Sequence, residues 1–93
     1  MLLRLLKTIA EFTTKTGRDP YTREVLRWLR SWGYGHQTLK LAEKLGLINR
    51  YEAPHPIYEN IICIYNTITR LGQKILQILQ MQDDEEENEE EPP

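Results

Sequence analysis

Residues 22–48 have the sequence TREVLRWLRSWGYGHQTLKLAEKLGLI. In its first part, apolar residues recur at the i, i+3, i+4, i+7 spacing of a helix, at Val25, Trp28, Leu29 and Trp32. A Gly-Tyr-Gly turn over residues 33–35 is predicted to end this helix. A second helix is predicted over residues 36–45, with Gly46 as its ending residue. Two helices joined by a short glycine-containing turn are typical of a helix-turn-helix unit.

The segment before this unit is predicted to form another helix, over about residues 2–15. Leucine and isoleucine recur there at helical spacing, and Gly17 follows as a helix-ending residue. The turn over residues 18–22 offers Asp19 or Thr22 as the cap of the next helix. The N-terminal half of the chain is therefore expected to consist of three helices joined by turns.

The segment after the unit changes from helical to strand-like patterning. β-Branched and aromatic residues dominate residues 47–52 and 57–68, and the Ala-Pro-His-Pro loop between them favours a β-hairpin. A last helix, capped by Thr69, is expected over residues 70–82. Its inner residues are predicted to be Leu71, Ile75, Ile78 and Leu79. The predicted fold class is α+β, mainly α, with three helices, a hairpin and a C-terminal helix.

Charge divides the 93-residue chain into two unlike parts, although its formal net charge is only −2. Residues 1–82 hold twelve basic and six acidic residues, a formal charge of +6, whereas residues 83–93 hold eight acids and no base. A run of like charges without apolar residues is expected to be disordered. We therefore predict one folded domain over residues 1–82 and a disordered acidic tail over residues 83–93. The tail either competes with a polyanionic partner or only raises solubility.

Length and composition exclude several classes of protein. A single domain of this size leaves little room for a deep catalytic cavity. The longest uninterrupted apolar run, residues 61–65, is too short to span a membrane, and the charged N-terminus lacks the apolar region of a secretory signal. The lone cysteine, Cys63, rules out an intrachain disulfide and favours a reducing compartment. A cytoplasmic protein is expected.

Residues that could catalyse a reaction or bind a metal are scattered. His36, His55 and Cys63 fall on separate expected elements without the spacing of metal ligands. Cys63 lies among isoleucines in the middle of an expected strand and is expected to be an inert small hydrophobic residue. The sequence contains no glycine-rich phosphate loop, and its clustered carboxylates lie in the tail. We expect no enzyme activity, no metal and no cofactor.

Taken in order, these segments resemble the winged-helix-turn-helix proteins that are common among archaeal and bacterial DNA-binding regulators. The resemblance is carried by the two central helices, by Leu45-Gly-Leu-Ile48 after them, and by Ile68-Thr-Arg-Leu-Gly72 before the last helix. It spans about residues 5–80. It implies that the third helix enters the major groove of DNA while the second crosses the phosphate backbone.

The resemblance also implies which side chains contact DNA. The arginines of the second helix share one face and suit phosphates, because a guanidinium group offers a planar fork of donors. In the third helix, Gln37 can pair with adenine and Lys40 with guanine. The candidate DNA-binding residues are Arg23, Arg27, Arg30, His36, Gln37, Lys40, Lys44 and Arg50.

Other interpretations of these residues stay open. The arginine face can be an ordinary solvated surface, and His36 can be structural. The aromatic residues are expected in the core rather than as stacking platforms for single strands: Trp28, Trp32, Tyr34 and Tyr51. The hairpin loop carries no lysine or arginine, which does not favour its insertion into the minor groove. Leu41 places an apolar group on the groove face, where it can touch a thymine methyl group or a protein.

The first and last helices carry more leucine and isoleucine than one small core needs. A homodimer through these two helices is expected, or a protein partner bound to the same surface. The leading hypothesis is a small transcriptional regulator or chromatin-associated factor that binds double-stranded DNA. The alternative is an accessory subunit of a polymerase, replication or ribosome-associated complex, in which the winged helix docks on protein. The sequence does not decide between DNA and RNA.

Overall fold

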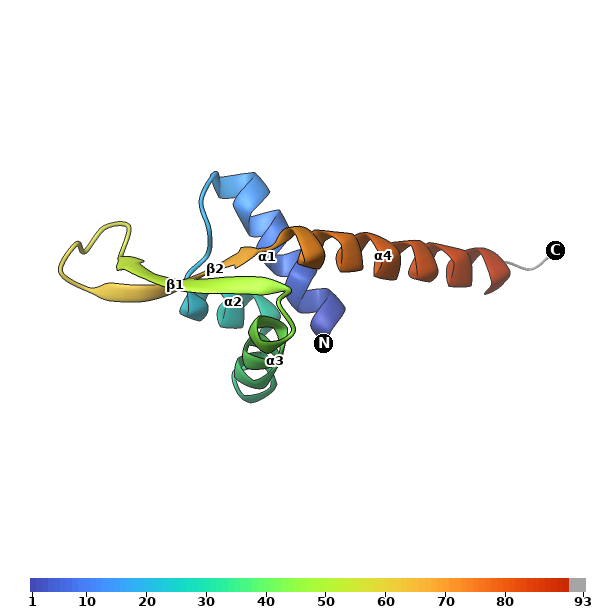
Figure 1. The fold of residues 1–93 in the computed structure, drawn as a ribbon, viewed down its shortest axis with the longest axis horizontal. Helices are drawn as coiled ribbons and strands as arrows, with labels where there is room; N and C mark the ends of the chain where they lie inside the picture. The colour runs from blue at the N-terminus through green and yellow to red at the C-terminus, as the bar shows by residue number, and fades with distance from the viewer. Residues whose placement is uncertain (91–93) are drawn as a thin grey trace.

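The computed structural model describes the backbone of residues 1–90 and the side chains up to residue 81. The elements follow one another as α1 (Leu2–Thr16), α2 (Thr22–Leu29), α3 (Gly33–Lys44), β1 (Ile48–Pro54), β2 (Ile62–Ile68) and α4 (Arg70–Glu90). The first three helices gather in the middle, while the hairpin and α4 extend in opposite directions (Figure 1). The fold is α+β, mainly helical, with a winged-helix-like topology, as the sequence predicted.

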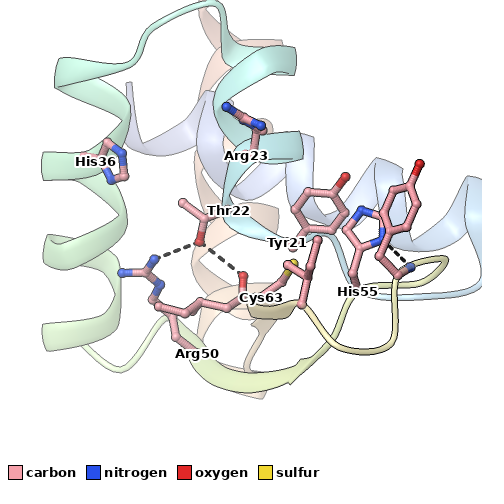
Figure 2. Close-up of a pocket in the computed structure, with 10 residues that line it drawn as sticks. Tyr21, Thr22, Arg23, His36, Arg50, His55 and Cys63 are labelled. Carbon is pink, nitrogen blue, oxygen red and sulfur yellow. Dashed lines mark hydrogen bonds between the residues drawn. The ribbon is translucent and has the colours of Figure 1, made fainter.

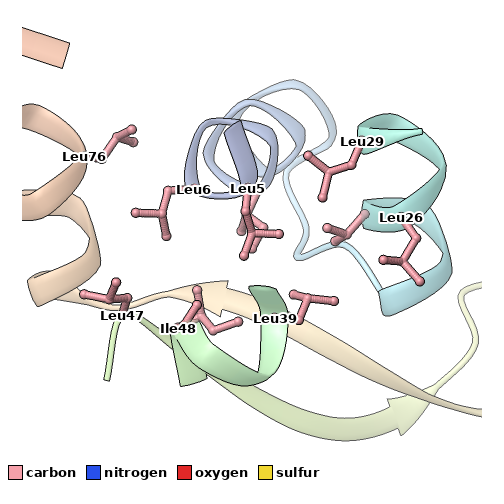
Figure 3. Close-up of a cluster of buried hydrophobic side chains, with 11 residues drawn as sticks. Leu5, Leu6, Leu26, Leu29, Leu39, Leu47, Ile48 and Leu76 are labelled. Atoms are coloured by element: carbon pink, nitrogen blue, oxygen red, sulfur yellow. The ribbon is translucent and has the colours of Figure 1, made fainter. Parts of the chain in front are cut away.

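The core lies where α1 crosses the helix-turn-helix unit and the base of the hairpin. Its buried members interlock around α1 (Figure 3): Leu5, Leu6, Ile9, Val25, Leu26, Leu29, Leu39, Ala42, Leu47, Ile48 and Leu76. The prediction that Trp28 and Trp32 belong to it is wrong, because their side chains are 42% and 53% exposed. Val25, Leu26 and Leu29 already fill the buried stripe of the short helix α2. Tyr34 and Tyr51, also expected in the core, are exposed as well.

The cap of α2 differs from both predicted candidates. Tyr21 precedes the helix, and the carboxylate of Glu24 accepts a hydrogen bond from the Tyr21 backbone N–H at 3.1 Å. Thr22 is the first helical residue, and its hydroxyl donates to the carbonyl of Ile64 on the hairpin. The carboxylate of Asp19 accepts a hydrogen bond from the hydroxyl of Tyr51. Both predicted caps are thus occupied by contacts to the hairpin, which a local pattern does not reveal.

The turn between α2 and α3 lies earlier than predicted. Arg30 ends α2 in the left-handed region, at φ 55°, and α3 already begins at Gly33. Gly35 is therefore inside the helix, and its role is close packing. A Cβ atom at Gly35 would lie 2.5 Å from Cδ2 of Leu26. Gly35 thus allows α3 to pack closely against α2, and the Gly-Tyr-Gly segment does not form the turn.

The hairpin is antiparallel, with a register that runs from Ile48 opposite Ile68 to Pro54 opposite Ile62. Its first strand is longer than predicted, and its second begins at residue 62 rather than 57. His55 explains the difference, because its Nδ1 accepts hydrogen bonds from two backbone N–H groups in the loop, at 3.0 and 3.2 Å. The connection is therefore a folded loop over residues 55–61.

The start of α4 is as predicted, and its later course differs. Thr69 caps it, since its hydroxyl oxygen accepts a hydrogen bond from the backbone N–H of Gly72 at 3.0 Å. The residue that it buries in the core is Leu76, whereas two predicted inner residues, Leu71 and Ile78, are about half exposed. Gly72 sets this rotation, because a Cβ there would lie 2.0 Å from the carbonyl oxygen of Leu47.

The last helix runs past its predicted end at residue 82, since α4 continues to Glu90. Glutamate has a high intrinsic helix propensity, which favours continuation of a helix that has already begun. Residues 91–93, the end of the predicted disordered tail, lie outside the described residues. The division into a domain and a tail therefore stays a prediction. Among the described residues, none of the helices has the length and apolar character that crossing a membrane requires.

Candidate nucleic-acid interface

The arginines of α2 form an exposed basic face, which we call the α2 arginine face. Its members are Arg23, Arg27 and Arg30. Within the part of the chain whose side chains are described, their guanidinium groups form no hydrogen bond or ion pair. The neighbouring acid does not neutralise them, because both oxygens of Glu24 accept hydrogen bonds from Arg18, each at 2.8 Å. The arginine face therefore keeps its positive charge.

The ion pair of Arg18 and Glu24 is a structural contact. The hydrogen bonds to Glu24 raise the pKa of Arg18 above its already high ordinary value. The guanidinium group also lies 5.0 Å from the ring centre of Phe12, a cation–π distance. Arg18 thus fastens the turn before α2 to α1, and Glu24 helps to begin α2 at the same time.

The outward face of α3 is polar and basic, as the sequence predicted. Leu39 and Ala42 are buried, and the positions between them point away from the core. The exposed side chains of this face are His36, Gln37, Lys40, Leu41 and Lys44. Their spacing of three and four residues places them on successive turns of one helix face. Donors for base edges and for phosphates are therefore presented together.

Arg50 has a different role from the other candidate residues. Its Nε donates to Oδ1 of Asn66, and its Nη2 donates to the hydroxyl of Thr22, both at 2.9 Å. Asn66 is fully buried, and its Nδ2 donates to the carbonyl of Pro20. We call this set of contacts the Asn66 network. Arg50 joins the hairpin to the start of α2 through it, so its guanidinium group is partly committed within the fold.

A pocket of about 470 Å³ lies between the start of α2, the beginning of α3 and the hairpin (Figure 2). It is lined by Tyr21, Thr22, Arg23, His36, Arg50, His55, Tyr58, Ile61, Cys63 and Ile64. Three of the predicted site residues therefore meet in it. The remaining five lie outside its walls, on the exposed faces of α2 and α3: Arg27, Arg30, Gln37, Lys40 and Lys44.

Sequence reasoning missed the aromatic side of this pocket. The ring of His55 lies 5.2 Å from the ring centre of Tyr21 and 5.1 Å from that of Tyr58. Tyr21 is 34 positions before His55 in the sequence, and the hairpin meets it through a bridge between Tyr21 and Tyr65. No local spacing carries this signal.

The far part of the hairpin is apolar rather than basic. Its exposed large side chains are Ile57, Tyr58, Ile61, Ile62 and Ile64. We call this surface the apolar hairpin end. Lysine and arginine are absent from residues 53–61, so the loop offers no such side chain for a phosphate contact.

Two stacked tyrosines hold the hairpin in place, Tyr51 by a hydrogen bond to the turn before α2 and Tyr65 by one within the hairpin. The hydrogen bond that Tyr51 donates to Asp19 raises the pKa of Tyr51 to about 12. The hydroxyl of Tyr65 donates to the carbonyl of Pro54 at 2.7 Å, and burial raises the pKa of Tyr65. Both side chains stack on each other, with ring centres 5.6 Å apart. Both contacts require the neutral phenol, so the hairpin is fastened most firmly below the pH at which tyrosine ionises.

A comparison of the chain with protein-family models, with curated proteins and with solved structures finds no match. Within residues 1–81, histidine, cysteine and acidic side chains do not gather in groups of three that could hold a metal ion. What the interface can do is therefore inferred from its own side chains.

Proposed function

We propose that the protein binds double-stranded DNA through α2 and α3, with α3 in the major groove. The supporting observation is that α2 and α3 both have exposed basic faces. Glu24, the acid between Arg23 and Arg27, does not neutralise the first of these faces, because it is hydrogen-bonded to Arg18. An α-helix fits the width of the major groove, and exposed lysine and arginine neutralise phosphates. The winged-helix-like topology places these two helices side by side in the way that such binding requires.

The proposal gives each face a separate task. In α3, Gln37 pairs with adenine and Lys40 with guanine, whereas Lys44 lies one turn farther along and contacts a phosphate. The α2 arginine face contacts phosphates of the backbone, and His36 lies at the edge of the groove. Arg50 acts mainly by holding the hairpin against α2. Affinity then comes from the helices, and the apolar hairpin end adds no phosphate contact.

The acidic segment of residues 83–93 adds a competitor to this interface. It carries eight acids, and the rest of the chain has a formal charge of +6. We propose that it covers the basic faces in the absence of DNA and so weakens non-specific binding more than specific binding. A small transcriptional regulator or chromatin-associated factor would use such a device to avoid random duplex. The single cysteine fits a cytoplasmic location for it.

A homodimer is part of the same proposal. Along α4, the exposed apolar residues are Leu71, Ile78 and Met81, and Leu2 and Leu3 of α1 are only partly buried. Apolar side chains left open on two packed helices are typical of a subunit interface. Two copies joined through α1 and α4 would present two α3 helices to successive turns of the major groove.

The matched pair Lys40→Gln and Lys74→Gln tests the proposal. Both lysines are exposed and both changes remove one positive charge, but Lys40 lies on α3 and Lys74 on α4. Because Lys74 shares a helix face with Leu71 and Ile78 of the proposed dimer surface, the elution mass of both variants is compared with that of the natural chain. Loss of one groove contact should weaken duplex binding about fivefold for Lys40→Gln at low salt, with little change for Lys74→Gln. Binding is measured by fluorescence anisotropy with a labelled duplex. Equal losses for both variants would mean that net charge, and not α3, carries the affinity.

The apolar hairpin end favours a second candidate function. Five large apolar side chains on one hairpin, together with the exposed Leu41 of α3, are more typical of a protein-docking surface than of a DNA-binding wing. In this alternative the chain is an accessory subunit of a polymerase, replication or ribosome-associated complex. A chain that fails to bind duplex but elutes in a large complex from its native cell extract would favour this function over the first.

A further inference from the structure

The pocket beside the α2 arginine face has two chemically different sides. Its apolar side is formed along the hairpin by Ile61, Cys63 and Ile64. The rings of Tyr21 and Tyr58 each contact the ring of His55 in a tilted arrangement, with interplanar angles of 48° and 36°, and add an aromatic wall. Tyr21 and His55 can be followed in Figure 2. Its volume of about 470 Å³ lies within the range of small-molecule sites. The walls therefore fit an apolar molecule of one or two aromatic rings.

The other side of the pocket is positively charged. Arg23 and Arg50 both line it, and none of its ten lining residues is acidic. The Asn66 network fixes the guanidinium group of Arg50, using its Nε and Nη2 atoms. Its Nη1 forms no hydrogen bond with another residue among the described side chains. A guanidinium group held in place in this way needs no reordering to accept an anion, which strengthens its binding.

We propose that this pocket binds a small aromatic carboxylate. The ring packs against the aromatic wall and the isoleucines, where face and edge contacts between rings are favourable. The carboxylate accepts hydrogen bonds from Arg50 and Arg23. Inorganic phosphate could bind the same two arginines, but it would not cover the apolar walls, which would stay exposed to water. The apolar lining therefore favours an aromatic acid over a free phosphate.

Bound ligand would compete with DNA. Arg23 lines the pocket and belongs to the α2 arginine face, and His36 lines it from the first turns of α3. An anion that occupies Arg23 takes away one phosphate contact and adds a negative charge beside the groove face. This competition rests on the proposed DNA binding, whereas occupation of the pocket itself does not.

The first experiment measures ligand binding to the full chain without DNA. The probes are 2-naphthoate and 2-naphthamide, which have the same shape and differ in charge. Two-dimensional NMR should show shifts of the backbone amides of Tyr21, His55 and Cys63 with the acid, at a dissociation constant of about 1 mM or below. The amide should bind about tenfold more weakly, because it lacks the charge-assisted hydrogen bonds. Equal binding of the two probes would overturn the proposal.

Variants locate the site. Cys63→Phe fills the pocket and should abolish the shifts, whereas Cys63→Ser keeps its size and should retain them. Arg23 is exposed, so Arg23→Gln does not threaten the fold and should weaken binding of the acid about fivefold. Thermal unfolding confirms that each variant is folded. If naphthoate binds Cys63→Phe as well as the natural chain, or if inorganic phosphate displaces it at equal concentration, the aromatic acid site is wrong.

A DNA competition experiment separates this proposal from the proposed function. Saturating naphthoate should weaken duplex binding about threefold or more, by removing one phosphate contact. Ligand binding without any DNA binding would overturn the proposed function and leave the pocket assignment intact. Ligand binding together with unchanged DNA binding would overturn the competition alone.

Discussion

The helix-turn-helix unit and the hairpin use their polar side chains in opposite ways. On the outer faces of α2 and α3, side chains such as Arg27 and Lys40 are exposed and make no hydrogen bonds or ion pairs within the described residues. On the inner side of the hairpin, Arg50 and Asn66 form hydrogen bonds with each other and with the segment that begins α2. Polar groups with internal partners stabilise a structure, whereas unpartnered charges are available for a ligand. Residues that stabilise the fold around the site thus differ from residues whose charges are available to contact a ligand.

The largest expected effect tests the holding role of the hairpin. Asn66→Ala removes a fully buried amide and leaves the Nε of Arg50 and the carbonyl of Pro20 with fewer partners. The free energy of unfolding should fall by about 2–3 kcal/mol, the cost of unpartnered buried polar groups. Urea unfolding measures it. The control is Asn49→Ala, the same change at an exposed position of β1, which should cost less than about 0.5 kcal/mol. Similar losses of stability at both positions would mean that the buried hydrogen bonds of Asn66 do not stabilise the fold.

The next effect concerns the α2 arginine face. Changing Arg27 and Arg30 together to glutamine should leave the free energy of unfolding within about 0.5 kcal/mol, because neither guanidinium group has an internal partner. Duplex affinity should fall about tenfold at low salt, and the slope of log K against log salt should become less steep by about 2.

The matched control for this double variant changes Arg70 and Lys74 of α4 to glutamine, which removes the same charge from exposed positions outside the proposed DNA interface. Its elution mass is compared with that of the natural chain, because Lys74 lies on the proposed dimer face. Its salt slope should stay within about 0.5 of the natural chain. A double variant of α2 that unfolds easily but binds DNA normally would show that the arginine face supports the fold instead.

A smaller effect is expected at the contact between Tyr51 and Asp19. Folding raises the pKa of Tyr51 to about 12 through its hydrogen bond to Asp19. The neutral phenol is thus the form that folding favours. This contribution is complete below about pH 10, the ordinary value for tyrosine, and disappears as the pH rises toward 12. Tyr51→Phe should cost about 0.5–1 kcal/mol at neutral pH and make unfolding less sensitive to pH between about 10 and 12. An unchanged alkaline slope would contradict the assignment.

The smallest effect is local and concerns the loop of residues 55–61. His55→Ala removes the acceptor of two backbone N–H groups, those of Ile57 and Tyr58. Both hydrogen bonds are exposed, so global stability should change by only about 0.5 kcal/mol. Amide hydrogen exchange at these two residues should become faster, while exchange in α3 stays the same. Protection that persists without the imidazole would mean that the loop is ordered by other contacts.

The sequence predicted the order of elements because each helix has its own apolar period and the hairpin its own β-branched runs. It also predicted the exposed face of α3, since Leu39 and Ala42 fix which side is buried. It misplaced the cap of α2, because Asp19 and Thr22 are engaged by the hairpin. It misplaced the turn before α3, because Arg30 adopts a left-handed conformation without being glycine. The first of these differences arises because tertiary contacts outweigh local preference.

The candidate site divides along the same line. Residues on α2 and α3 could be chosen from helical spacing, which depends only on neighbours in the sequence. The commitment of Arg50 to Asn66 could not, because the two residues meet through the register of the hairpin. The pocket likewise joins Tyr21 to His55 across more than thirty positions of sequence. Long-range pairing of this kind needs the fold before it can be seen.

The most direct test of DNA binding through the basic helices is the salt dependence of duplex binding. Fluorescence anisotropy would follow a labelled duplex from about 50 to about 300 mM salt, with the full chain and with a chain shortened after Gln82. If the basic helices bind DNA, binding should be micromolar or tighter, the slope of log K against log salt should be about −4 to −5, and the shortened chain should bind more tightly at low salt. Absence of binding by the shortened chain at the lowest salt, despite its formal charge of +6, would contradict the account.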